Sequence, residues 1–226
     1  CKRSEVGGAI RIGALERACI HQHAEPQKLF LLPPKGKLVA IIGSGLSSLT
    51  VAWDCMRKGY SVKIFEPGKI LGESLCEHYP DLLPRKVVDE ETTLLEKLGM
   101  KVEINAPVND PGFLDRCLKS FEAIYLGLDS LRNGSWQLEV DDQGNIRIVP
   151  QTQGTSMKGV FAGGLPRFGL VSPVWQVAEG RWAANSIDRY IHKVSLTAGR
   201  EKEGPFATRL FTNMVNVSPL SAIKAA

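Results

Sequence analysis

The sequence predicts an α/β domain with a parallel sheet, because a strand, a turn, a helix and a second strand follow one another. Residues 38–42 form a continuous β-rich apolar run, as expected for a central parallel strand buried on both faces. A glycine-containing turn at 43–45 and a helical stretch at 46–58 follow, and residues 61–65 form the second strand. A unit of this kind, about thirty residues long, is typical of a Rossmann-type domain.

The remaining elements are predicted from shorter patterns. We expect helices at 90–98, 111–120 and 173–191, and strands at 101–104, 123–127 and 159–162. Residues 136–140 and 145–149, joined by a turn at 142–144, predict a small β-hairpin. An amphipathic stretch near residues 10–21 adds a helical N-terminal extension.

These elements divide the chain into three parts. We expect an N-terminal helical segment at 1–34, the Rossmann-type domain at 35–192 and an extended C-terminal arm at 193–226. The chain begins with cysteine rather than methionine, so we expect it to be an internal fragment of a longer polypeptide.

The composition excludes several classes of partner. The formal net charge of +4 comes without a run of lysine and arginine, so no nucleic-acid partner is expected. The longest apolar run, at residues 38–42, is far too short to span a membrane, so no membrane partner is expected either. The five cysteines are scattered and odd in number, which favours reduced thiols in a cytoplasmic protein.

The turn at 43–47 is the first candidate binding site. Gly43 permits a tight turn, Gly45 lets the backbone approach a pyrophosphate, and the start of the next helix offers free N–H groups to that anion. Glu66 ends the second strand, where a carboxylate can accept hydrogen bonds from an adenosine ribose. The alternative is an ordinary turn with a surface glutamate. The third fingerprint position is Ser48 rather than glycine, which should loosen the packing of helix against strand.

The start of the last helix is the second candidate. Ser172 is a candidate N-cap and Pro173 a candidate first helical residue, after the strand and Gly163-Gly164. The positive end of this helix could stabilise negative charge on the N1/O2 edge of a flavin. The alternative is a well-capped core helix.

The order of these motifs resembles one family. The segments at 39–45, 63–67, 96–99, 159–164 and 177–181 follow one another as in the glutamate synthase small-subunit family of NAD(P)H:FAD oxidoreductases, within the pyridine nucleotide-disulfide oxidoreductase superfamily. The resemblance covers about residues 1–192.

The resemblance implies that the domain binds FAD. It carries over these cofactor-binding residues: Gly43, Ser44, Gly45, Leu46, Ser47, Glu66, Pro67, Gly72, Gly164, Leu165, Ser172, Pro173 and Val174. It also implies that Cys1 ends an N-terminal iron–sulfur region and ligates a 4Fe-4S cluster only together with cysteines upstream of this chain.

The chain departs from the family in three places. The family's NAD(P)H-binding insert is missing near residues 129–136, and no second glycine fingerprint occurs. Leu165 stands where the family has an acidic residue that anchors the flavin. The glycine pair after the second strand is reduced to Gly72 alone.

We therefore expect an FAD-binding electron-transfer module of a larger iron–sulfur oxidoreductase, whose partner is an iron–sulfur domain or subunit. The flavin would carry the chemistry, and no catalytic side chain is expected. The alternative is a flavin-free, degenerate Rossmann scaffold that mediates docking of subunits.

Overall fold

The structure, a computed structural model, describes residues 9–22, 30–80, 83–131, 136–165, 172–200 and 203. The chain divides into two compact units, of which Leu31–Thr208 is the larger. Helix α1 (Ile12–Gln22) belongs to the other unit and matches the helix predicted near residues 10–21. None of the described helices has the length and apolarity that crossing a membrane requires.

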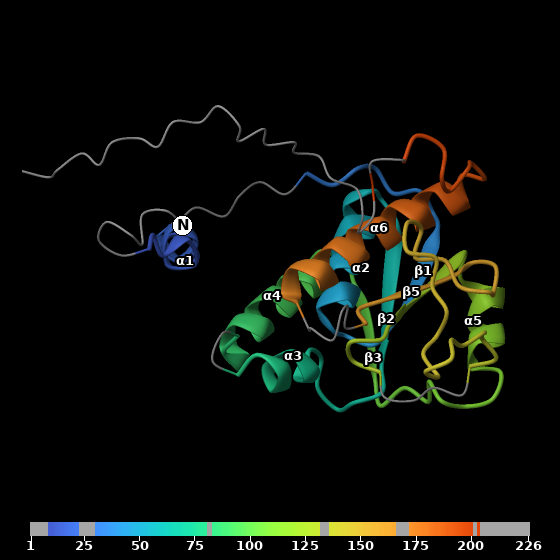
Figure 1. Cartoon of the computed structure of the whole chain (residues 1–226), viewed down its shortest axis with the longest axis horizontal. Coiled ribbons are helices and arrows are strands. Elements are labelled where there is room, and N and C mark those ends of the chain that lie inside the picture. The colour runs from blue at the N-terminus through green and yellow to red at the C-terminus, as the bar shows by residue number, and fades with distance from the viewer. Residues whose placement is uncertain are drawn as a thin grey trace, which may run out of the picture. The chain divides into compact units, whose positions relative to one another are not determined.

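The larger unit contains a five-stranded parallel sheet (Figure 1), which confirms the predicted fold class. Its order is β3-β2-β1-β4-β5. The strands are β1 (Leu38–Ile42), β2 (Ser61–Glu66), β3 (Lys101–Ile104), β4 (Ala123–Gly127) and β5 (Val160–Gly163). The order changes direction at β1, because β2 and β3 lie on one side of it and β4 and β5 on the other. This is the switch point at which doubly wound sheets form a crevice.

Five helices accompany the sheet within the residues that the structure describes. They are α2 (Leu46–Arg57), α3 (Glu73–His78), α4 (Arg85–Lys97), α5 (Phe113–Ser120) and α6 (Pro173–Ile191). Helix α3 was not predicted, because a helix of six residues is too short to show a clear period. Helix α4 begins five residues earlier than predicted, with Pro84 at its N-cap.

The predicted hairpin is reduced to a single antiparallel bridge between Val140 and Ile146. The turn itself forms, since the Asp141 carboxylate accepts backbone N–H groups of Gln143 and Asn145, both at 2.9 Å. The chain beyond the turn then pairs elsewhere, with Gly154 bridging to Phe161 of β5. The prediction of two full strands was therefore wrong.

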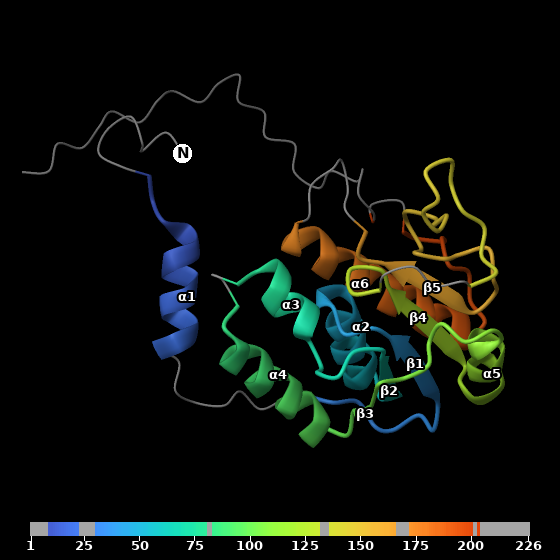
Figure 2. The same ribbon diagram turned by 90° about the horizontal axis from the view of Figure 1, so that it is seen from below.

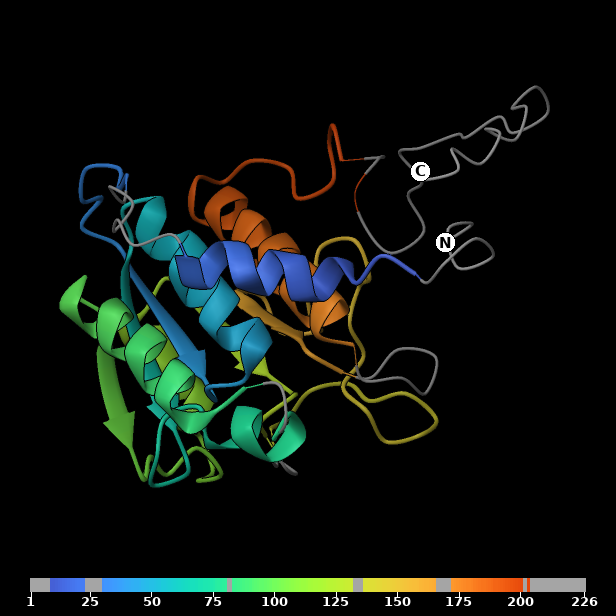
Figure 3. The same cartoon turned by 90° about the vertical axis from the view of Figure 1, so that its left-hand side faces the viewer.

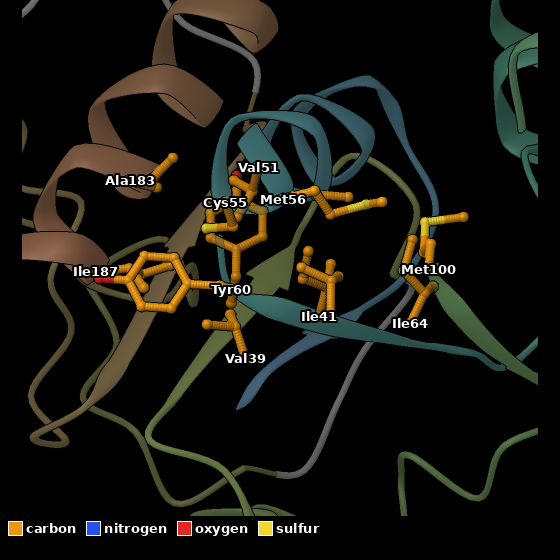
Figure 4. Packing of buried hydrophobic residues seen from close by; sticks show 14 of the residues in the cluster. Val39, Ile41, Val51, Cys55, Met56, Tyr60, Ile64, Met100, Ala183 and Ile187 are labelled. Atoms are coloured by element: carbon orange, nitrogen blue, oxygen red, sulfur yellow. The ribbon is translucent and has the colours of Figure 1, made fainter. Parts of the chain in front are cut away.

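Strand β1 is the centre of the core because its alternate residues face opposite helices. Val39 and Ile41 pack in one cluster with residues of α2 and α6 (Figure 4). Ala40 and Ile42 pack in a second cluster with residues of α5, which lies on the other side of the sheet (Figure 2). All four side chains are fully buried, as the apolar run predicted.

Helices α2 and α6 lie side by side on one face of the sheet (Figure 3). Their contact is close at Gly180. A Cβ added there would lie 2.6 Å from the Ser47 carbonyl oxygen and 2.8 Å from Thr50 Cβ. Only glycine fits this contact without a shift of one helix.

An ionic cluster joins the end of α2, the start of β2 and the end of α6. The Asp188 carboxylate accepts hydrogen bonds from Tyr60 Oη at 2.5 Å, Lys35 Nζ at 3.1 Å and Lys58 Nζ at 3.1 Å. Burial raises the pKa of Asp188, but these bonds outweigh it and lower the pKa to about 2. The cluster therefore stabilises the folded state when Asp188 is ionised.

A buried arginine holds residues 193–200 against α6. Arg200 is 1% exposed, and its guanidinium donates to Ser186 Oγ at 2.7 Å and to the Trp182 carbonyl oxygen at 3.3 Å. Glu203 Oε2 accepts from Arg200 Nε at 2.7 Å. The buried charge is thus paired and hydrogen-bonded, as buried charges must be.

Replacing Gly180 with alanine should destabilise the larger unit. The added methyl group overpacks the α2–α6 contact, which costs roughly 1–3 kcal/mol and outweighs the gain in helix propensity of about 1 kcal/mol. Equilibrium unfolding in urea measures the difference. The control is Gly13→Ala in α1, where nothing lies within 4 Å of the added Cβ. Equal stability of Gly180→Ala and the natural chain would contradict the close contact.

Replacing Asp188 with asparagine should cost about 2 kcal/mol at pH 7, the worth of a pKa lowered from its ordinary value to about 2. A lowered folded-state pKa gives stability above the unfolded-state pKa, about 4, and loses it as the pH falls toward 2. The free energies of unfolding of the natural chain and of Asp188→Asn should therefore converge as the pH falls from 7 to 2. The control is Asp142→Asn, which removes the same charge at an exposed position. A difference that does not depend on pH would show that the charge of Asp188 is not responsible.

Candidate functional site

The turn from Gly43 to Ser47 lies at the carboxyl edge of the sheet, where β1 leads into α2. Gly43 has φ +88°, and a Cβ there would lie 2.3 Å from Ser130 Oγ, so the turn requires glycine. Gly45 occupies the N-cap of α2, and Leu46 is the first helical residue. The first backbone N–H groups of α2 are thus presented at the switch point of the sheet.

Ser44 and Glu66 are both buried and connect this turn to the end of β2. Ser44 Oγ donates to Glu66 Oε2, and the Gly72 N–H donates to Ser44 Oγ at 2.8 Å. The Gly68 N–H donates to Glu66 Oε1 at 2.7 Å. The structure thus brings together three residues predicted for the site, and the alternative of a surface glutamate does not hold. The carboxylate keeps spare lone pairs for further donors.

A cavity of about 530 Å³ borders this network at the carboxyl edge of the sheet. Its lining is acidic, with four carboxylates and one histidine. The lining residues are Glu66, Pro67, Gly68, Glu73, Ser74, Glu77, His78, Val108, Asn109, Leu128, Asp129, Ser130 and Leu131. Within the part of the chain that the structure describes, no group of three or more His, Cys, Asp or Glu could hold a metal ion.

Asp129 binds the first turn of α2. Its Oδ2 accepts the Ser47 N–H at 3.0 Å, and its Oδ1 accepts the Ser47 hydroxyl at 2.9 Å. Burial raises the pKa of Asp129; the two bonds from Ser47 lower it, the negative charge of Glu179 raises it, and the net shift is upward. A carboxylate here benefits from the free N–H groups and the positive dipole end of the helix.

Gly164 lies beside the same turn. Its N–H donates to Glu179 Oε2 at 2.7 Å, and Glu179 is buried in α6. A Cβ at Gly164 would lie 2.7 Å from Asp129 Oδ1 and 2.8 Å from Ser47 Oγ. The end of β5 is therefore packed against the turn, as expected if both contribute to one site.

Two buried polar atoms near Gly163 have no hydrogen-bond partner among the described residues, Tyr125 Oη and Gln153 Oε1. A Cβ at Gly163 would lie 2.8 Å from the first and 3.0 Å from the second. Burial raises the pKa of Tyr125 well above its ordinary value, and the negative charges of Asp129 and Glu179 raise it further. The tyrosine is therefore a neutral hydroxyl behind the site.

The start of α6 keeps its predicted position but not its predicted cap. Ser172 occupies the N-cap with extended backbone, yet its side chain makes no capping hydrogen bond among the described residues. Pro173 is in the first helical turn, and Val174 is 77% exposed. Leu165 is half-buried. A hydrogen bond of 3.1 Å from Tyr79 Oη to Gln176 Oε1 ties this turn to the end of α3.

Cys1 lies outside the described residues, as do residues 166–171 between the two parts of the second candidate segment. Pro67 lines the cavity. Gly72 is the N-cap of α3 and supports Ser44, as described above. The structure thus groups the turn, Glu66, Pro67, Gly72 and Gly164 at one edge of the sheet.

Sequence reasoning missed Asp129 and Glu179 as parts of this site. Asp129 comes two residues after β4, which is a neighbour of β1, so its place at the carboxyl edge was open to prediction. Ser48 was expected to loosen the packing of α2. It is fully buried, and Gly127 of β4 leaves the space for it, since a Cβ there would meet Ser48 Oγ at 1.9 Å.

Comparison with known proteins supports this architecture. Residues 41–98 match the family model of the NAD(P)-binding Rossmann-like domain. The chain is 28% identical over 116 residues to the NADP(+)-dependent formate dehydrogenase subunit beta of Moorella thermoacetica, covering 51% of this chain and 16% of that protein.

Two relatives from Escherichia coli (strain K12) are similar over a longer stretch. The small chain of glutamate synthase [NADPH] is 25% identical over 150 residues, covering 65% of this chain and 32% of its own. The NAD-dependent dihydropyrimidine dehydrogenase subunit PreT is 30% identical over 138 residues, covering 60% and 33%. The chain spans a third or less of these three relatives. The resemblance inferred from the motifs is confirmed.

Proposed function

We propose that this chain binds FAD and serves as an electron-transfer module of a larger oxidoreductase. The observation that carries the proposal is the network of Ser44, Glu66 and Gly72 beside the turn that opens α2, at the switch point of the sheet and on the edge of a cavity. The similar proteins are named as parts of oxidoreductases, which supports the same class of reaction.

The residues present fit the adenylate half of FAD. Glu66 lines the cavity and has lone pairs left for ribose hydroxyls, and the N–H groups at the start of α2 suit a pyrophosphate. Gly164, Leu165 and the start of α6, Ser172–Val174, are assigned to the flavin half. The bound flavin would supply the electron-transfer chemistry, while the protein binds and orients it.

The proposal includes a partner. Residues 1–34 would end an iron–sulfur region with Cys1 as a ligand of a 4Fe-4S cluster, residues 35–192 would form the FAD-binding domain, and residues 193–226 an arm. Electrons would pass to an iron–sulfur domain or subunit rather than to bound NAD(P)H, since the family's insert is missing near residues 129–136. A reducing, cytoplasmic setting agrees with the free thiols of Cys19, Cys55, Cys76 and Cys117.

A flavin-free docking scaffold is the second candidate. It is favoured by Asp129, whose carboxylate binds the N–H group that a pyrophosphate would use, and by Leu165 in place of an acidic anchor. In this case the site would serve only packing between subunits.

FAD should bind in preference to FMN, because Glu66 and the turn at 43–47 both address the adenylate half that FMN lacks. Fluorescence titration of the apoprotein with each flavin measures this. Glu66→Gln should weaken FAD binding by roughly tenfold, the worth of one hydrogen bond to a charged group. The matched control is Glu73→Gln, which removes a carboxylate from the same cavity and should not weaken binding. Equal affinity for FAD and FMN would refute the assignment.

Neither NADH nor NADPH should reduce the bound flavin quickly, whereas dithionite should. The expected cause is the missing NAD(P)H-binding insert, since the matched Rossmann unit at 41–98 would be occupied by FAD. Anaerobic absorption spectra of the flavin-loaded chain test this. Rapid, stoichiometric bleaching by either nicotinamide would overturn the proposed direction of electron flow.

A further inference from the structure

The Asp129 carboxylate occupies the position best suited to an anionic ligand. It accepts both the backbone N–H and the hydroxyl of Ser47, in the first turn of α2. These are the donors that the start of a helix offers to a phosphate group. The site's strongest anion-binding contacts are therefore already made by a side chain of the same protein.

The carboxylate also fills the space that the glycines leave open. A Cβ at Gly45 would lie 2.3 Å from Asp129 Cγ, and a Cβ at Gly164 would lie 2.8 Å from the same atom. The absence of a side chain at Gly45 is what permits a phosphate to approach the backbone in a Rossmann turn. Asp129 and a phosphate group cannot share this space.

The electrostatic surroundings oppose a second anion. Asp129 interacts electrostatically with Tyr125 on β4, Glu179 on α6 and Tyr79 at the end of α3. Glu66, Glu73, Glu77 and His78 line the cavity with it, and no described lining residue is a lysine or arginine. Two negative charges held close together repel strongly away from bulk water. The Asp129 carboxylate would therefore repel a pyrophosphate from the position that the carboxylate itself occupies.

We propose that Asp129 is a tethered competitor for the pyrophosphate of the cofactor, so that a dinucleotide binds only when the Asp129 side chain leaves Ser47 or is neutralised. This inference rests on the proposed function and adds a regulated step to it. The raised pKa of Asp129 adds a dependence on pH, with tighter binding under acidic conditions.

The test uses ADP-ribose, which carries the adenosine and the pyrophosphate but no flavin, and adenosine, which carries no phosphate. Calorimetric titration of the full chain should show that Asp129→Asn binds ADP-ribose roughly tenfold or more tightly than the natural chain, as the loss of a like charge predicts. Adenosine affinity should not change. The natural chain should bind ADP-ribose more tightly as the pH is lowered from 7, and Asp129→Asn should lack this slope.

Two comparisons keep the test decisive. Glu73→Gln removes the same charge from the same cavity, and an equal gain in ADP-ribose affinity would overturn the proposal in favour of general acidity. Asp129→Ala, checked by its melting temperature, serves if Asp129→Asn does not fold. Unchanged ADP-ribose affinity in a folded Asp129 variant overturns the proposal, whether or not the variant binds FAD. A gain for ADP-ribose without FAD binding would support the tethered competitor while refuting the flavin function.

Discussion

The rest of the structure depends on the burial of β1 on both faces. Val39 and Ile41 require a layer containing α2 and α6, and Ala40 and Ile42 require a layer containing α5. Because β1 is held from both sides, the turn that leaves it has a fixed direction. The close contact at Gly180 then fixes the position of α2 relative to α6, since Gly180 packs against the carbonyl of Ser47. The anion-binding end of α2 is thus positioned by core packing rather than by the loop itself.

A common arrangement of polar groups appears along the carboxyl edge of the sheet. Three acidic side chains accept a backbone N–H from a neighbouring segment: Glu66 from Gly68, Asp129 from Ser47 in the first turn of α2, and Glu179 from Gly164. Each bond satisfies a donor that would otherwise need water or a ligand. The acidic side chains of this edge are therefore already engaged in internal hydrogen bonds. A cofactor that uses one of these N–H donors must replace the internal hydrogen bond with one of its own.

The elements with strong local signals could be predicted from the sequence. The run at 38–42 contains only apolar residues and is followed by glycines, so both the strand and the turn were evident. The hairpin is shorter than predicted. Residues 136–140 and 145–149 carry the alternation of strands, but the chain beyond Ile146 bonds to the β5 region instead. Tertiary pairing decided the outcome, and local pattern could not reveal it.

The residues of the candidate site that belong to a motif could be predicted from the sequence. Those whose role depends on the room left between distant residues could not. Gly43, Gly45 and Glu66 follow from their places at the ends of strands. The role of Asp129 depends on the gap between Gly45 and Gly164, which are more than a hundred residues apart in the sequence and meet only in the fold. Similarly, the room for Ser48 comes from Gly127 on another strand, which no pattern within α2 could indicate.

The position of Arg200 has a consequence for handling this protein in the laboratory. A recombinant version ending at Ile191 would remove the guanidinium that binds the Ser186 hydroxyl and the Trp182 carbonyl of α6, and the buried Ser186 would lose this charged donor. Expression of the isolated domain therefore needs the chain through Glu203, whose carboxylate completes the arginine's hydrogen bonds.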